Sequence, residues 1–164
     1  MNMLEVKVEG LALDMTTNSP VVILAAEGVD KVLPIWIGHA EAWGIAMELS
    51  GIKSARPMTY DLIRNIIESL NANLDRVEIT ELREQTFFAR LLISNKDQKY
   101  EIDARPSDSI ALALKSKAGI FVNEQLFQLK EGEPGHSPNM ATDPETLRER
   151  LRKINPEDFG KYPL

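Results

Sequence analysis

The sequence predicts an α+β fold in which mixed or antiparallel sheets pack against helices. Some segments alternate apolar and polar residues with a period of two, as strands do, and others repeat apolar residues every three or four positions, as helices do. The order of three strands followed by a helix occurs in both halves of the chain. The 164 residues leave room for one such domain and a tail. We expect the domain at 1–130, a flexible linker at 131–142, and a short C-terminal helix and tail at 143–164.

The first half of the chain is expected to contain strands over 4–13, 21–26 and 32–37, and then a helix over 40–49. Gly10 interrupts the alternation of the first strand, and the continuous apolar run 21–26 is typical of a strand that is buried on both faces. Pro34 favours an edge position or a bulge for the third strand. Gly51 is a plausible end for the helix.

The second half is expected to repeat this order with strands over 77–82, 87–94 and 100–104 and a helix over 107–114. Ser107 is the expected N-cap of that helix. Between the halves, apolar residues at three-and-four spacing predict a helix over 59–70 with Thr59 as its N-cap. After the second unit, the segments 120–122 and 126–129 predict a last hairpin.

Two similar halves suggest an internal duplication. A shift of 67 positions places residues 33–37 on 100–104, and it places Glu41 on Asp108. We therefore predict duplicated β-β-β-α units with an extra helix between them. The alternative, that this order of elements is simply common, stays open.

Composition narrows the classes of function. The net charge is −6, so we do not expect a broad basic surface that binds nucleic acid. An enzyme that acts on nucleic acid through a bound divalent metal is still compatible with this charge, because it needs carboxylates. The absence of cysteine excludes disulfides, thiolate metal sites and thiol nucleophiles. The longest purely apolar run, 21–26, is too short to span a membrane, and residues 1–10 do not resemble a secretory signal. We therefore expect a cytoplasmic protein.

Common catalytic motifs are missing from the sequence. It contains no GxxxxGK[ST] or GxGxxG loop for phosphates, no HExxH zinc motif and no GxSxG nucleophile motif. The two histidines are His39 and His136, so a histidine metal site would need carboxylates or a second subunit to complete it. We expect His136 to be a solvated residue of the linker.

Three polar clusters remain, each at the end of a strand or the start of a helix. They are 38–41 with His39 and Glu41, 56–61 with Arg56 and Asp61, and 103–108 with Asp103, Arg105, Ser107 and Asp108. Helix capping is one explanation, because acidic residues in a first turn complement the helix dipole. An anion docked on free N–H groups at the start of the helix is a second explanation. A divalent cation that bridges Asp103 and Asp108, with Glu41 from the other unit, is a third.

Three stretches resemble the bifunctional nuclease family in sequence, order and spacing. They are IWIGHAEAWGIA (35–46), RPMTYDL (56–62) and DARPSDSIALAL (103–114), and the resemblance extends over roughly 4–129. The family occurs in bacteria, archaea and plants, and its plant enzymes are described as degrading both RNA and DNA. The resemblance implies an α+β fold with duplicated units and nuclease activity. At matching motif positions it implies the site candidates Glu41, Arg56, Asp61, Asp103, Arg105 and Asp108.

The first functional hypothesis is a metal-dependent phosphodiesterase that acts on RNA and single-stranded DNA. Asp103, Asp108 and Glu41 would hold Mg²⁺ or Mn²⁺, which activates water, and His39 or a metal-bound hydroxide would act as the base. Arginines would clamp the phosphate oxygens. The expected substrate-binding residues are Arg105, Arg56, Ser107 and Asp61.

Two further hypotheses involve no catalysis. One is an oligomeric scaffold or regulatory module, in which Asp103 pairs with Arg105, and Asp61 pairs with Arg56. The other is a metal-free protein that binds small anions at the helix starts near Ser107 and Thr59. A homodimer is expected under either the nuclease or the scaffold hypothesis, because pairing across a symmetric dimer covers exposed strand edges.

Overall fold

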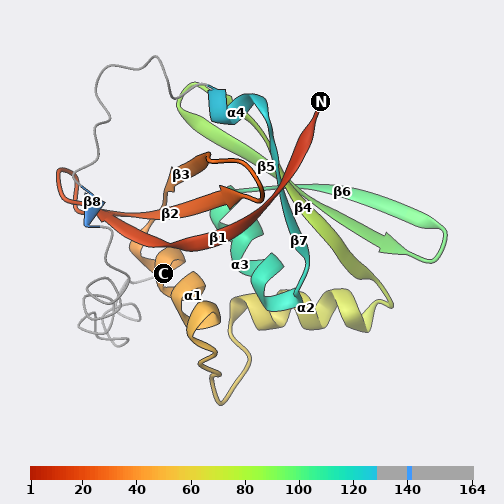
Figure 1. Ribbon diagram of the computed structural model, residues 1–164. Helices are drawn as coiled ribbons and strands as arrows, with labels where there is room; N and C mark the ends of the chain where they lie inside the picture. Colours follow the sequence, from red (N-terminus) through yellow and green to blue (C-terminus); the bar gives the residue numbers. More distant parts are fainter. Residues whose placement is uncertain (129–139, 142–164) are drawn as a thin grey trace.

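The computed structural model describes residues 1–128 and 140–141 of the chain. None of the helices in these ranges is both long and apolar enough to cross a membrane. The predicted α+β class is confirmed, and Figure 1 shows the elements. In chain order they are β1 (Met3–Asp14), β2 (Ser19–Ala26), β3 (Val32–Trp36), α1 (His39–Ser50), α2 (Thr59–Ser69), β4 (Asn73–Arg83), β5 (Thr86–Asn95), β6 (Gln98–Ala104), α3 (Pro106–Ser116), β7 (Gly119–Asn123), α4 (Gln125–Gln128) and β8 (Met140–Ala141).

The strands form one mixed sheet with the spatial order β3-β2-β1-β7-β4-β5-β6, and β8 pairs with β1. The strands β1, β2 and β3 are antiparallel to one another, and so are β4, β5 and β6. Between these two groups, β7 pairs antiparallel with β1 and parallel with β4. Each half of the chain therefore has the predicted order of three strands and a helix. A common origin of the two halves stays a prediction.

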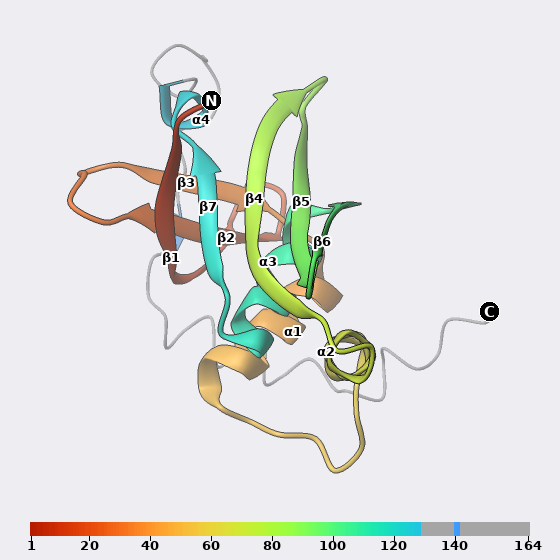
Figure 2. The same ribbon diagram turned by 90° about the vertical axis from the view of Figure 1, so that its right-hand side faces the viewer.

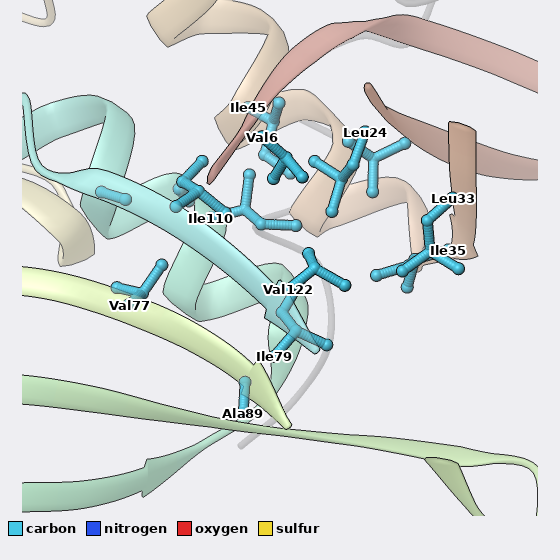
Figure 3. Close-up of a cluster of buried hydrophobic side chains, with 14 of the residues drawn as sticks. Val6, Leu24, Leu33, Ile35, Ile45, Val77, Ile79, Ala89, Ile110 and Val122 are labelled. Atoms are coloured by element: carbon cyan, nitrogen blue, oxygen red, sulfur yellow. The ribbon is translucent and has the colours of Figure 1, made fainter. Parts of the chain in front are cut away.

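The hydrophobic core is centred on α3. Seven of its 11 residues are buried, whereas α1 buries only Ala42 and Ile45. Figure 3 shows Ile110 of α3 among core side chains from both halves, which include Val6, Ile45 and Val77. Because α3 packs against strands and helices of both halves, it fixes the position of Arg105 at its start and of its own polar residues.

The structure corrects one prediction for the first three strands and confirms two others. Gly10 does not end β1; the strand continues through it, and the register with β2 shifts between Val8 and Gly10. Such a bulge absorbs one extra residue and bends the strand. In β2, Val21 and Val22 are consecutive and so lie on opposite faces, and both are fully buried, as predicted. Pro34 lies in β3 at one end of the sheet, which confirms its edge position.

The predicted N-caps of two helices are wrong by one or two residues. The N-cap of α2 is Met58, whose N–H donates to Asp61 Oδ2 at 3.0 Å, and Thr59 is the first helical residue. The N-cap of α3 is Arg105, and Ser107 lies inside the first turn. A residue before proline is held in extended backbone, so Arg105 cannot be helical and α3 begins at Pro106.

The predicted C-terminal hairpin is also wrong. Its first strand exists as β7, but residues 125–128 form the short helix α4 instead of a partner strand. Both edges of β7 are already occupied, by β1 and β4, so no edge is left for a hairpin partner. Leu126 and Phe127 are buried as part of the core. The linker expected at 131–142, apart from the two residues of β8, and the helix expected after 143 lie outside the described residues.

Candidate active site

A cleft of about 680 Å³ lies between α1, α2 and α3, next to β5 and the end of β6. Each of the three helices contributes residues to its wall, as does the connection between α1 and α2. Apolar side chains make up much of this wall: Trp43, Met47, Ile52, Met58, Ile63, Leu91 and Leu112. Against this apolar background, charged residues form two ion-paired clusters.

The first cluster is centred on Arg105, at the junction of β6 and α3. Its Nε and Nη2 donate to Asp108 Oδ2 and Oδ1 at 2.9 Å and 3.1 Å, which is a two-point contact with one carboxylate. Its Nη1 donates to Glu41 Oε1 at 3.0 Å. Hydrogen bonds and the charge of Asp108, followed by those of Glu41, raise the pKa of Arg105 above its usual range. Arg105 is still 64 % exposed, so a ligand can reach its guanidinium.

Tyr60 completes this cluster from α2. Its hydroxyl donates to Asp108 Oδ1 at 3.0 Å. Burial, followed by the negative charge of Asp108, raises the pKa of Tyr60, so the phenol keeps its proton and remains a donor. A Cβ on Gly44 of α1 would lie 2.9 Å from the Tyr60 ring, which is closer than real Cβ contacts allow. Glycine at position 44 therefore lets the ring lie against α1.

The second cluster is centred on Lys115 of α3. Its Nζ lies 2.7 Å from Asp61 Oδ1 and also pairs with Glu48 of α1. Burial alone would lower the pKa of Lys115, but the hydrogen bonds that it donates to the carboxylates of Asp61 and Glu48 outweigh burial and raise it. The hydrogen bond from Lys115, together with that from the Met58 backbone, holds the pKa of Asp61 below its usual range. This cluster joins all three helices that surround the cleft.

The structure brings together five of the residues singled out in the sequence. The cleft is lined by Glu41, Asp61, Asp103, Arg105 and Asp108. Of these, Asp103 is an exposed residue near the end of β6.

The other three candidates, His39, Arg56 and Ser107, are not among the described residues that line the cleft. Both pairings expected for a scaffold are wrong for the described residues. Asp61 pairs with Lys115 instead of Arg56, and Arg105 pairs with Glu41 and Asp108 instead of Asp103.

Sequence reasoning missed Tyr60, Glu48 and Lys115. The sequence did carry a signal for Glu48 and Lys115. Glu48 lies seven residues after Glu41, and Lys115 lies seven residues after Asp108, so each lies two helical turns along on the same face of its helix. The shift of 67 positions that places Glu41 on Asp108 also places Glu48 on Lys115. Tyr60 lies within the RPMTYDL stretch but carries no signal of its own.

The carboxylates of Glu41, Asp108 and Asp103 are the oxygen donors that Mg²⁺ and Mn²⁺ accept. Among residues 1–128 and 140–141, no three histidine, aspartate or glutamate side chains stand together as a ready metal-binding group. Arg105 pairs with both Glu41 and Asp108. The donor chemistry therefore fits a hard divalent cation, and Arg105 would have to leave both carboxylates for the cation to bind between them.

Comparison with known proteins agrees with the resemblance seen in the sequence. The sequence model of the bifunctional nuclease domain matches residues 21–133, which include the whole cleft. An uncharacterized protein of Mycobacterium tuberculosis, Rv1829, is 40% identical over 162 residues, covering 94% of this chain and 97% of the relative.

Plant relatives are more distant. Bifunctional nuclease 1 of Oryza sativa subsp. japonica is 27% identical over 116 residues, which cover 69% of this chain and 35% of the plant protein. Bifunctional nuclease 1 of Arabidopsis thaliana is 25% identical over 116 residues, covering 69% of this chain and 36% of that protein. This chain thus spans about a third of the length of these two plant relatives. The domain model matches residues 21–133, and the mycobacterial protein is similar over 94% of the chain. The chain therefore belongs to the bifunctional nuclease domain family.

Proposed function

We propose that this chain is a nuclease that hydrolyses phosphodiester bonds of RNA and single-stranded DNA in the cleft between α1, α2 and α3. One observation carries the proposal: an exposed arginine, Arg105, is held by two carboxylates at one end of an apolar cleft. A guanidinium presents paired donors that match two oxygens of a phosphate. The apolar wall offers surface on which a base or ribose can pack. The names of the plant relatives, bifunctional nuclease 1, point to the same activity.

Arg105 would bind the phosphate that is to be cleaved. Asp108 holds the guanidinium through Nε and Nη2, so a phosphate oxygen can replace Glu41 as the acceptor of Nη1 without loss of this two-point contact. Glu41 then becomes an unpaired carboxylate beside the phosphate and can accept a proton from the attacking water. The water oxygen forms the new bond to phosphorus as the bond to the leaving sugar oxygen breaks, and that oxygen takes a proton from solvent water. Tyr60 keeps Asp108 in place through its hydroxyl.

The proposal includes a divalent metal ion, Mg²⁺ or Mn²⁺. When the ion is bound, Arg105 would leave both carboxylates, and Asp108, Glu41 and Asp103 would hold the ion. The ion would then supply charge neutralisation on the phosphate and a more acidic water, in place of Glu41 as the base. Cleavage that requires Mn²⁺ or Mg²⁺ and stops in EDTA would support this part of the proposal. Cleavage that persists in EDTA would contradict it and leave the role of Arg105 intact.

Labelled single-stranded RNA and DNA, incubated with the purified full-length chain, test the activity itself. We expect cleavage that falls at least about 100-fold in Arg105→Ala and in the Asp103→Asn/Asp108→Asn double variant, because the phosphate-binding group or its support is lost. Arg83→Ala is the matched control, because Arg83 is 63 % exposed and also pairs with one glutamate, but lies on β4 outside the cleft. Cleavage that survives in Arg105→Ala would place the activity elsewhere or in a contaminant.

Small-anion binding is the second candidate, and a feature of α3 favours it. No side chain caps the start of α3, and Arg105 occupies its N-cap position beside the cleft. Phosphate binding that persists in EDTA, without any cleavage, would favour this function over hydrolysis. The absence of both would favour an oligomeric scaffold. Under each function we expect the chain to act in the cytoplasm as a homodimer.

A further inference from the structure

The strand β6 leaves a long, partly apolar edge at one end of the sheet. It has seven residues without proline, and no other strand in the described part of the chain pairs with its outer edge. Tyr100 and Ile102 are 45% and 46% exposed there. The opposite edge differs, because β3 has only five residues, contains Pro34 and lies near α4. An exposed edge with apolar side chains is a template for pairing with another strand.

We propose that two copies of this chain join their sheets through β6, which pairs antiparallel with β6 of the second copy around a two-fold axis at Glu101. This proposal gives an interface to the homodimer expected above. In this register Lys99 of each copy lies opposite Asp103 of the other, so two pairs of opposite charges form. Tyr100 of each copy lies opposite Ile102 of the other, so the exposed apolar side chains cover one another.

Other registers are less favourable. In a pair of strands related by a two-fold axis perpendicular to the sheet, side chains that lie opposite each other must be on the same face. The axis must therefore pass through a residue, and moving it by one residue shifts the pairing by two. An axis at Tyr100 would place Lys99 opposite Glu101, which already pairs with Arg90, and Asp97 of the preceding turn opposite Asp103. An axis at Ile102 would place Glu101 opposite Asp103. Around Glu101 the only like charges that face each other are the two Glu101 side chains. Each of them already has an ion pair at 2.9 Å with Arg90 of its own chain.

The helix α2 lies on the side of the sheet that this pairing would bring together. Tyr100 and Ile102 pair across β6 and β5 with Ile93 and Leu91, whose buried side chains face the core and the helices. Asn95 Nδ2 donates to Leu70 O at 3.2 Å and ties the end of α2 to the end of β5, next to the start of β6. Figure 2 shows α2 end-on, near the lower ends of β5 and β6.

The two-fold axis places both α2 helices on the same face of the joined sheet. On each α2, Leu62, Ile66 and Leu70 recur every four residues, on one side of the helix, and each is at least half exposed. Burial of part of this surface between the two copies would stabilise the dimer.

Sedimentation of the full-length chain tests the association. We expect about twice the 18.4-kDa mass of one chain. Lys99→Asp and Asp103→Lys should each raise the dissociation constant about tenfold or more, because each creates two pairs of like charges. The double variant Lys99→Asp/Asp103→Lys should restore association. Lys31→Asp, an equal charge change at an exposed loop before β3, is the control. A monomeric wild-type chain, or a dimer that is insensitive to both single reversals, would overturn the proposal.

A cross-link tests the register itself, because the chain has no cysteine. Opposite residues of antiparallel strands have Cα atoms about 4.5–5.5 Å apart, within the reach of a disulfide. Glu101→Cys should therefore form a disulfide-linked dimer in high yield under mild oxidation, whereas Gln98→Cys, which lies opposite Ala104, should not. Equal yields from both variants would reject the axis at Glu101. Neither readout depends on cleavage, so this proposal and the nuclease proposal fail independently.

Discussion

Among single residues, Glu78 illustrates how much one buried carboxylate can contribute to stability. Its side chain is 1% exposed, and it accepts contacts from Arg76 at 2.5 Å and from Arg90 at 2.6 Å. We expect Glu78→Ala to lower the free energy of unfolding by about 2 to 3 kcal/mol, because Arg76 loses its carboxylate and Arg90 keeps only Glu101. Urea denaturation measures this. Glu81→Ala, on the same strand with an exposed partner, should cost less than about 1 kcal/mol. Equal costs would mean that burial of Glu78 is unimportant.

Tyr60 allows a second prediction at the scale of one residue. Burial and the charge of Asp108 raise its pKa, so Tyr60 should stay protonated when ordinary tyrosines ionise near pH 10. The rise in tyrosinate absorbance up to about pH 11 should then be the same in the wild-type chain and in Tyr60→Phe. Asp108→Asn removes the negative charge but keeps an oxygen acceptor, so it should lower the pKa of Tyr60 and increase the absorbance change. A larger signal in the wild-type chain than in Tyr60→Phe would contradict the buried position of the phenol.

At the scale of elements, the attachment of α2 to α3 depends on Asp61. Its Oδ1 pairs with Lys115 and its Oδ2 accepts from the Met58 N–H, which keeps the folded-state pKa below the unfolded value. Such a group stabilises the fold fully above the unfolded pKa, and the stabilisation is lost as pH falls through the folded pKa. Asp61→Asn keeps an oxygen acceptor for Met58, so it should cost about 1 to 2 kcal/mol at pH 7.

Urea denaturation at two pH values checks this sign. The difference between the wild-type chain and Asp61→Asn should shrink below about pH 4, where the aspartate of the unfolded chain gains a proton before that of the folded chain does. Glu68→Gln, at the exposed end of α2 with Arg64 at 3.8 Å, should change stability little at either pH. A cost for Asp61→Asn that stays constant down to pH 3 would show that its charge has no role.

Most elements could be predicted because their signals are local. Alternation located β4 and β5, and three-and-four spacing located α2, within a few residues of their ends. The segment 125–128 was predicted wrongly because its structure depends on distant neighbours: β1 and β4 occupy both edges of β7. The four residues of this segment do not reveal which edges of the sheet are already occupied. A short apolar run of this length is equally consistent with a strand and with a helix.

At the scale of the whole molecule, the candidate site could likewise be predicted only where its signals are local in the sequence. Sequence clusters identified Glu41, Arg105 and Asp108, but only the fold shows that one arginine binds two carboxylates that lie 67 positions apart in the chain. Lys115 was missed because a lysine in the last turn of a helix is ordinarily explained by the helix dipole. Tyr60 was missed because its role depends on contact with Gly44 and Asp108, which lie on other helices.

The charge of the whole chain leads to a last prediction, on nucleic-acid binding. The net charge is −6, and the cleft offers Arg105 and Lys115 as cations, so a single strand bound there should release few counterions. With about two phosphates neutralised, the logarithm of the affinity should fall with the logarithm of salt concentration with a slope between about −1 and −2. Fluorescence anisotropy of a labelled single-stranded RNA in EDTA, between about 50 and 200 mM salt, measures this slope. Arg105→Ala should make the slope shallower by about 0.7, whereas Arg83→Ala should leave it unchanged. A slope steeper than about −4 would mean that many cations outside the cleft hold the strand, and the cleft would then not be the main binding site.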